Sequence, residues 1–209
     1  MAILNINPTR MEMLGLKKKI KSAKRGHKLL KDKQDGLMQK FMEIIRKAKA
    51  MREEVEEKLG AAFQNFIRAG SIMEEEFLEG ALLFSTATTE LSVKTKNVMS
   101  VRIPQFTLKQ GGEAINYGYL QTSGELDMAL QSFQDVFPLL IELAEIEKSA
   151  EALADELEKT RRRVNALEYR MIPDLEDTIK FIKMKLGEME RGAVVNTMIV
   201  KEKIAAAGK

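Results

Sequence analysis

The chain has 209 residues, of which 31% are charged, 6% are aromatic and none is cysteine, and its formal net charge is +3. The lack of cysteine excludes disulfide bonds, thiol catalysis and zinc sites built on cysteine. The small net charge disfavours a duplex-DNA binder, because proteins that neutralise many phosphates usually carry a more one-sided charge. High charge with few aromatic residues is instead typical of long helices.

The first predicted element is a long helix whose start is marked by Thr9 and Glu12, the spacing of a capping box. No proline follows Pro8 until Pro104, so helical structure can continue to about residue 83. Residues at alternating steps of four and three form a heptad seam: Leu16, Ile20, Ala23, His27, Leu30, Gln34, Leu37, Phe41, Ile44, Ala48, Met51 and Val55. A stripe this narrow and this long is typical of a coiled coil.

Two polar residues, His27 and Gln34, occupy this otherwise apolar seam. We interpret both as residues that set the coiled-coil register, as a buried Asn does in other coiled coils. A catalytic or pH-sensing role for His27 is the less favoured alternative. Since it is the only histidine of the chain, a histidine metal cluster is excluded.

A basic stretch, KKKIKSAKRGHKLLKDK, covers residues 17–33 and contains nine Lys or Arg. On the heptad, three lysines fall beside the seam, and Glu176 and Glu190 of the second helix are expected to meet part of this row. Lys19 and Lys33 fall on the other side of the seam, and four cations point outward toward an external partner: Lys18, Lys21, Arg25 and Lys28. Aromatic residues do not interleave with the cations, so we favour a protein partner over nucleic acid or a membrane surface.

A β-hairpin is predicted in the middle of the chain, where Thr, Val and Ser become frequent. Its two short strands are expected at Leu91–Lys94 and Met99–Ile103, since polar and apolar residues alternate there. Gly111 and Gly112 mark the loop that follows.

The second long helix is expected to start near Thr122, with Glu125 completing another capping box. Its seam changes phase by one residue near Pro173, which should disturb the supercoil locally. The seam residues are Leu143, Ile146, Ala150, Leu153, Leu157, Thr160, Val164, Leu167 and Met171, then Leu175, Ile179, Ile182, Leu186, Met189 and Ala193.

The predicted fold is mostly α, a long antiparallel two-helix coiled coil of the N- and C-terminal segments with a small central region that contains a short β-hairpin. We divide the chain into an N-terminal coiled-coil helix at 9–83, a central region at 84–121 and a C-terminal coiled-coil helix at 122–200. One consistent register places His27 opposite Ile182, Leu30 opposite Ile179 and Gln34 opposite Leu175, and the neighbouring registers one heptad away stay open.

Sequence motifs for catalysis are missing: the chain contains no GxxxxGK[ST], GxGxxG or HExxH. We therefore expect an interaction protein that is not an enzyme and has no cofactor or metal. Because no apolar run approaches the ~18 residues of a membrane span and the start lacks the features of a signal peptide, we expect a soluble, cytosolic protein.

Several longer motifs resemble the D subunit of the V-type/A-type rotary ATPases. They are NPTRMEMLGLKKKIKSAKRGHKLLKDKQDGLMQKF, NVMSVRIPQF, YGYL and EKTRRRVNALEYRMIPDLEDTIKFIKMKL, and they follow in order from about residue 5 to 191. The resemblance implies a non-catalytic central-stalk subunit, a rotor shaft that couples ATP hydrolysis or synthesis to ion translocation. Its coiled coil would stand inside the hexamer of A and B subunits, peripheral to the membrane.

The resemblance also implies partner-binding residues. Those expected to face the hexamer are Arg25, Lys28, Lys31, Arg161, Arg162 and Arg163. The hairpin, with Val93, Val101 and Ile103, is expected to contact the small F subunit, and the middle of the chain to dock on the C (d) subunit. The alternative function is a stand-alone coiled-coil chaperone or adaptor, and nucleic-acid binding is disfavoured.

Overall fold

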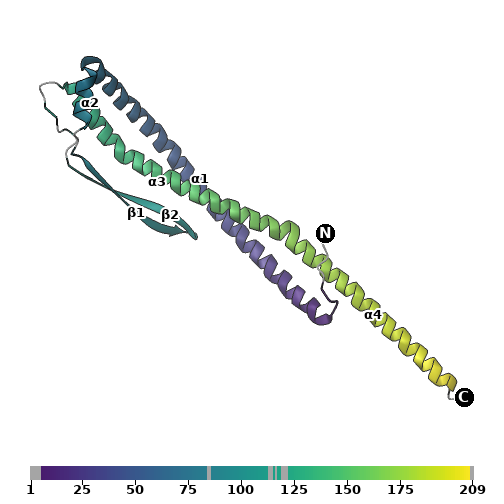
Figure 1. The fold of residues 1–209 in the computed structure, drawn as a ribbon. Coiled ribbons are helices and arrows are strands. Elements are labelled where there is room, and N and C mark those ends of the chain that lie inside the picture. Colours follow the sequence, from purple (N-terminus) through teal and green to yellow (C-terminus); the bar gives the residue numbers. More distant parts are fainter. Residues whose placement is uncertain (1–5, 84–85, 113–114, 116, 119–121, 208–209) are drawn as a thin grey trace. The chain divides into compact units, whose positions relative to one another are not determined.

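The computed structural model describes residues 6–83, 86–112, 115, 117–118 and 122–207. Its elements are α1 (Arg10–Ile72), α2 (Glu75–Leu83), β1 (Thr88–Val98), β2 (Val101–Gly111), α3 (Gly124–Ala166), the π-helix η1 (Leu167–Met171) and α4 (Ile172–Ala207) (Figure 1). The predicted fold class is confirmed: a long N-terminal and a long C-terminal helical segment pack together, and a small two-stranded hairpin lies between them in the chain. Residues 84–85, 113–114, 116 and 119–121 of the predicted central region lie outside the described residues.

Helix α1 begins as its sequence predicts. The hydroxyl of Thr9 accepts a hydrogen bond of 3.2 Å from the backbone N–H of Glu12, which satisfies one of the free donors of the first turn. Along the helix, all twelve seam residues from Leu16 to Val55 are buried or half-buried, and most residues between them are exposed. The heptad pattern therefore identifies the buried face of α1.

The chain forms two compact units, each with parts of both long helical segments. Unit 1 comprises Met1–Asp35 and Glu158–Lys209, and unit 2 comprises Gly36–Leu157. The core of unit 1 consists of buried Leu16, Leu175 and Ile182, and half-buried apolar residues pack around them: Ile6, Met13, Ile20, Ile179, Phe181 and Leu186.

The register inside unit 1 differs from the predicted one. Ile182 packs against Leu16, eleven residues before its predicted partner His27. His27 instead lies 3.3 Å from the carboxylate of Glu168. The prediction was wrong because a repeating apolar seam can be paired in several registers that bury residues of the same type, and the pattern alone does not choose among them.

The shifted register also exposes the end of the second seam. Near the start of α1, Arg10 pairs with Glu190 of α4 at 2.5 Å. All residues from 188 to 206 are exposed, and Met189 and Ala193 are among them. These two predicted seam residues therefore do not lie in the core, and neither does Met171, which is exposed in η1.

The predicted phase change of the second seam coincides with η1, directly before Pro173. One additional residue in an α-helix rotates all later side chains by about 100°. A single π-helical turn absorbs such an extra residue, so the later side chains keep their orientation. Accordingly, Val164 before the turn and Leu175 and Ile182 after it are all buried. Pro173, which lacks a backbone N–H, follows this turn as the second residue of α4.

Unit 2 contains two clusters of buried apolar residues. Val55 of α1 packs with Val136 and Leu143 of α3. Farther along, Phe133 of α3 meets Phe63 of α1 edge to face, with ring centroids 5.4 Å apart. Helix α3 contains Pro138 in its interior.

The second cluster of unit 2 joins the hairpin to the helices. Val101 of β2 packs with Leu37 of α1 and Leu153 of α3. The hairpin thus rests on both long helices, which an isolated pair of strands needs for stability.

The hairpin is longer than predicted, with eleven residues in each strand. Met99 was expected in the second strand, but it forms the two-residue turn with Ser100, and both have positive φ angles, 52° and 71°. This is the type I′ geometry, which usually carries Asn-Gly, so the sequence gives no turn signal. The side chain of Met99 lies against Gly36, where an added Cβ would be 2.8 Å from the methionine Cε, and glycine therefore permits this close approach.

Candidate interaction surfaces

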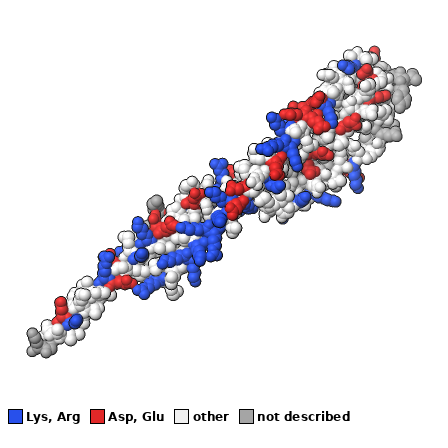
Figure 2. Space-filling view, turned by 180° about the vertical axis from the view of Figure 1, so that it is seen from behind, with Lys and Arg blue, Asp and Glu red and all other residues white. Residues whose placement is uncertain are grey.

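The basic stretch of α1 lies in unit 1 and is largely exposed. Lys24 pairs with Glu176 at 2.6 Å, which confirms one of the two expected contacts, whereas Glu190 pairs with Arg10 instead of a lysine beside the seam. The following cations are exposed and have no acidic partner among the described residues: Lys17, Lys18, Lys19, Lys21, Arg25, Lys28 and Lys31. Lys and Arg side chains accordingly gather over this part of the molecule in Figure 2.

A second group of cations, Arg161, Arg162 and Arg163, forms one exposed turn of α3 in the same unit. Arg162 pairs with Glu158 one turn earlier on the same helix. Exposed pairs of this kind contribute little free energy, about 0–1 kcal/mol. Arg161 and Arg163 have no acidic partner within the described ranges. Unit 1 therefore offers free cations from both of its helical segments.

The two polar seam residues lie where a register role requires them, at the face between the helices. The side chain of His27 is 21% exposed and contacts Glu168, which belongs to the π-helical turn. Gln34 is half-buried on the same face of α1. Their role in setting the register stays a prediction.

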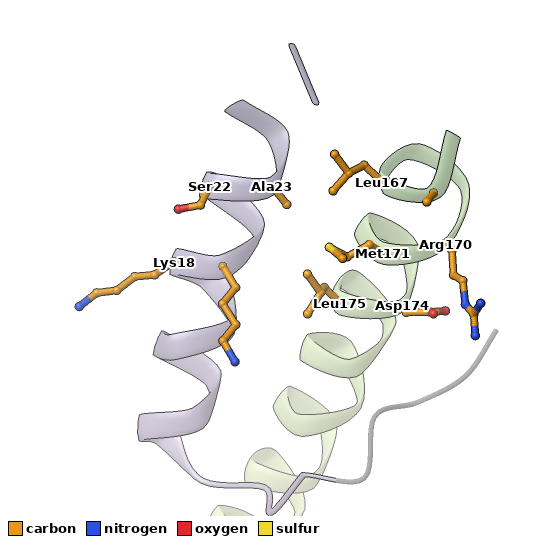
Figure 3. A pocket seen from close by; sticks show the side chains of 10 residues that line it. Lys18, Ser22, Ala23, Leu167, Arg170, Met171, Asp174 and Leu175 are labelled. Atoms are coloured by element: carbon orange, nitrogen blue, oxygen red, sulfur yellow. The ribbon is translucent and has the colours of Figure 1, made fainter. Parts of the chain in front are cut away.

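A groove of about 730 Å³ lies in unit 1 beside the π-helical turn. Figure 3 shows Leu167, Met171 and Leu175 pointing toward the helix that carries Ala23, while Lys18 and Arg170 point away. Since Ala23 is too small to fill the space between the helices, an apolar groove with cations at its rim remains open. The phase change of the seam was the only sequence signal for this site.

The predicted hairpin residues fall into two environments. Val101 is buried and Ile103 half-buried, and both pack into the molecule's own core. Val93 is 57% exposed on β1, and the neighbouring Leu91 is 46% exposed. Of these four residues, Val93 and Leu91 are the ones whose apolar side chains are accessible to a partner.

One carboxylate fixes the orientation of the hairpin. Glu145 of α3 accepts a hydrogen bond of 2.7 Å from the backbone N–H of Phe106 in β2. The β2 edge of the sheet therefore faces α3.

A separate surface contact lies within α3. There the hydrogen bond from Lys148 to Glu151 and the negative charge of Glu151 raise the pKa of Lys148.

Within the described ranges, no helix has the length and apolar character needed to cross a membrane. Among the same residues, no group of three or more His, Cys, Asp or Glu side chains lies together as a metal site.

Comparison with known proteins identifies the family. The model of the ATP synthase D-subunit family matches residues 12–202. The chain is 52% identical over 206 residues to the D subunit of the V-type ATP synthase of Acetivibrio thermocellus, covering 97% of this chain and 93% of that protein. It is 49% identical to the proteins of the same name from Clostridium novyi, over 206 residues (96% and 95% covered), and Clostridium botulinum, over 203 residues (95% and 94% covered). A core seam, a basic coiled coil and a family match that spans nearly the whole chain lead to one conclusion: the chain belongs to the family of ATP synthase D subunits.

Proposed function

We propose that this chain is the central-stalk subunit, the rotor shaft, of a V-type ATP synthase. In this role it is non-catalytic and couples ATP hydrolysis or synthesis in the hexamer of A and B subunits to ion translocation through the membrane ring. Family membership and the names of its relatives support a subunit of such a complex.

The observation that carries the proposal is the distribution of charge in unit 1. The apolar seam residues between its two helical segments pack in its own core, while cations without an acidic partner among the described residues lie on the outside of both segments. Charged contacts at a rim set orientation and association rate more than affinity. A shaft that turns inside a ring needs contacts of this kind, because deep apolar anchors would hold it in one position.

Arg25, Lys28 and Lys31 of α1 and the three arginines 161–163 of α3 are the proposed contacts with the hexamer. A two-helix coiled coil has no threefold symmetry, so three equivalent catalytic pairs around it contact different faces. Each pair then has a different nucleotide affinity, since a partner shifts a conformational equilibrium only through differential contacts. Rotation of the shaft passes these states around the ring, and the ATP chemistry belongs to the partners.

The remaining partners are proposed for unit 2. The F subunit contacts the hairpin, where Val93 with Leu91 offers exposed apolar surface, while Val101 and Ile103 hold the hairpin against the helices. The C (d) subunit of the stalk docks on the middle of the chain. The complex places the chain on the cytoplasmic side of the membrane, as a peripheral subunit.

The test is reconstitution with a purified A/B hexamer, with and without F, measured by co-elution and ATP hydrolysis at low and high salt. We expect co-elution at low salt that weakens as salt screens the cations. No co-elution at low salt would refute the shaft function, and binding of unfolded clients instead would favour the chaperone alternative.

A triple variant tests the assigned cations. Replacing Arg161, Arg162 and Arg163 by Ala should weaken hexamer binding while the helical circular dichroism signal stays unchanged. In the matched control, three exposed cations of α1 in unit 2 are replaced by Ala: Arg46, Lys47 and Lys49. This variant should bind the hexamer as well as the parent chain does. Equal losses in both variants would show that the arginines have no specific role.

A further inference from the structure

The outer edge of β1 offers backbone groups to which the proposed function gives no role, although that function assigns the side chains of Val93 and Leu91 on the same strand to a partner. The sheet has two strands only, and β2 faces α3 through the bond from Phe106 to Glu145. Among the described residues, no strand pairs with the other side of β1, and ten of its eleven residues are exposed. An uncovered strand edge of this length is a template for pairing with another strand.

The hydrogen-bond pattern shows which backbone groups lie at this edge. Phe106 stands opposite Val93, and its N–H points away from β1 to Glu145. In an antiparallel ladder, such a residue and its opposite form a non-hydrogen-bonded pair, so the backbone groups of Val93 also point outward. Because the pattern alternates, Leu91 and Thr95 present their N–H and C=O groups at the same edge. Pro104, opposite Thr95, fits this assignment, since its missing N–H would also point outward.

The two faces of β1 carry different side chains. Leu91 and Val93 lie on one face, and both are about half exposed. Lys94 and Lys96 lie on the other, where they stand opposite the uncharged Gln105 and Ile103. No acidic side chain within the described part of the chain neutralises these two lysines.

From this arrangement we infer that the β1 edge binds an extended segment of another protein by strand addition, a segment in which apolar residues alternate with Asp or Glu. Its apolar side chains cover Leu91 and Val93 on one face, and its carboxylates lie beside Lys94 and Lys96 on the other. Main-chain hydrogen bonds to residues 91, 93 and 95 supply affinity, and the two faces supply selectivity.

A second copy of the chain is the less suitable occupant. Pairing of two β1 edges brings Lys94 and Lys96 of both copies onto shared faces, and like charges on neighbouring strands are destabilising. Edge lysines are a common device against self-pairing. The same lysines attract an acidic strand.

The test uses the full chain and a fluorescent, capped peptide that alternates Val with Glu, with fluorescence anisotropy as the readout. Val93→Pro removes one outward N–H, and Val93→Thr is the matched control that keeps the N–H and the branched shape. Val93→Pro should weaken binding at least about tenfold, and the control should stay within about threefold of the parent. Equal binding by the two variants, or no binding of the peptide to the parent chain, overturns the inference.

A charge reversal tests the other face without changing any backbone group, which keeps the test valid if the proline disturbs the hairpin. Lys94→Glu with Lys96→Glu should lose the Val/Glu peptide and gain a Val/Lys peptide. An unchanged preference overturns the selectivity assigned to the lysines. Sedimentation of the chain without peptide tests whether a second copy occupies the β1 edge. If the parent chain is a dimer and Val93→Pro dissociates it, a second copy is the occupant and the inference is overturned. None of these measurements depends on the A/B hexamer.

Discussion

Deletion of Tyr169 tests whether the π-helical turn absorbs an extra residue. Tyr169 lies inside η1 and its side chain is 76% exposed, so its loss removes little buried surface. After the deletion the heptad steps are continuous, and an ordinary α-helical turn keeps Leu175 and Ile182 on the face that packs against α1. The free energy of unfolding should therefore stay within about 1 kcal/mol of the parent value.

The matched control is a deletion of Lys180, an exposed residue of α4 beyond the π-helical turn. This deletion rotates the following residues by about 100°. It moves the fully buried Ile182 and its neighbour Leu186 away from the core of unit 1. Loss of such contacts costs about 2–5 kcal/mol, which corresponds to a melting temperature lower by roughly 4–20 °C in a chain of this size.

Urea and thermal denaturation, followed by circular dichroism at 222 nm, compare the two deletions with Tyr169→Ala, which removes the side chain but keeps the length. We expect the Tyr169 deletion to resemble Tyr169→Ala. Equal destabilisation by the Tyr169 and Lys180 deletions would refute the argument that the turn takes up one surplus residue.

Three smaller changes probe other parts of the structure. Thr160→Val should raise the free energy of unfolding by about 1–2 kcal/mol, because the fully buried hydroxyl has no hydrogen-bond partner within the described ranges; a lower value in urea denaturation would contradict this. Ser100→Gly should stabilise the hairpin by about 1 kcal/mol, since glycine adopts the positive φ of this turn without steric cost; slower amide exchange in β2 is the readout. Glu145→Ala should speed exchange of the Phe106 amide, whose acceptor it removes, and leave the melting temperature of the helices nearly unchanged.

The seam of α1 was predictable from the sequence residue by residue. Its apolar positions follow the heptad without interruption, and the structure buries or half-buries all of them. The capping box at Thr9 was equally readable, because it depends on residues three positions apart. Local patterns of this kind need no knowledge of the partner helix.

The register was not predictable, since it depends on the match between two repeating patterns. His27 meets Glu168, and Leu16 meets Ile182, although a shift by one or two heptads would satisfy the apolar pattern almost as well. The hairpin turn was missed for another reason. Met99 is held at positive φ, and its side chain packs against Gly36, which lies 63 residues earlier in the chain.

The candidate surfaces, too, divide into a part that the sequence predicts and a part that depends on how the two helical segments pair. The exposed cations of unit 1 follow from heptad position, because outward positions remain outward in any register. By contrast, the groove at Ala23 exists only because a small residue of α1 lies beside the π-helical turn. Nothing in either segment alone specifies this pairing.

The final turns of α4 have a consequence for the way the chain melts. Residues 188–206 are exposed along their whole length, so apart from the surface pair of Glu190 with Arg10 they bury little against the rest of the described residues. An isolated helix of this length is marginal in water, because the first turn is costly to form. Here the paired part of α4 already provides that nucleus, and the end only adds residues to it. The helix should therefore shorten gradually from Ala207 toward Glu190 on heating, as a sloping loss of ellipticity that precedes the cooperative unfolding of unit 1.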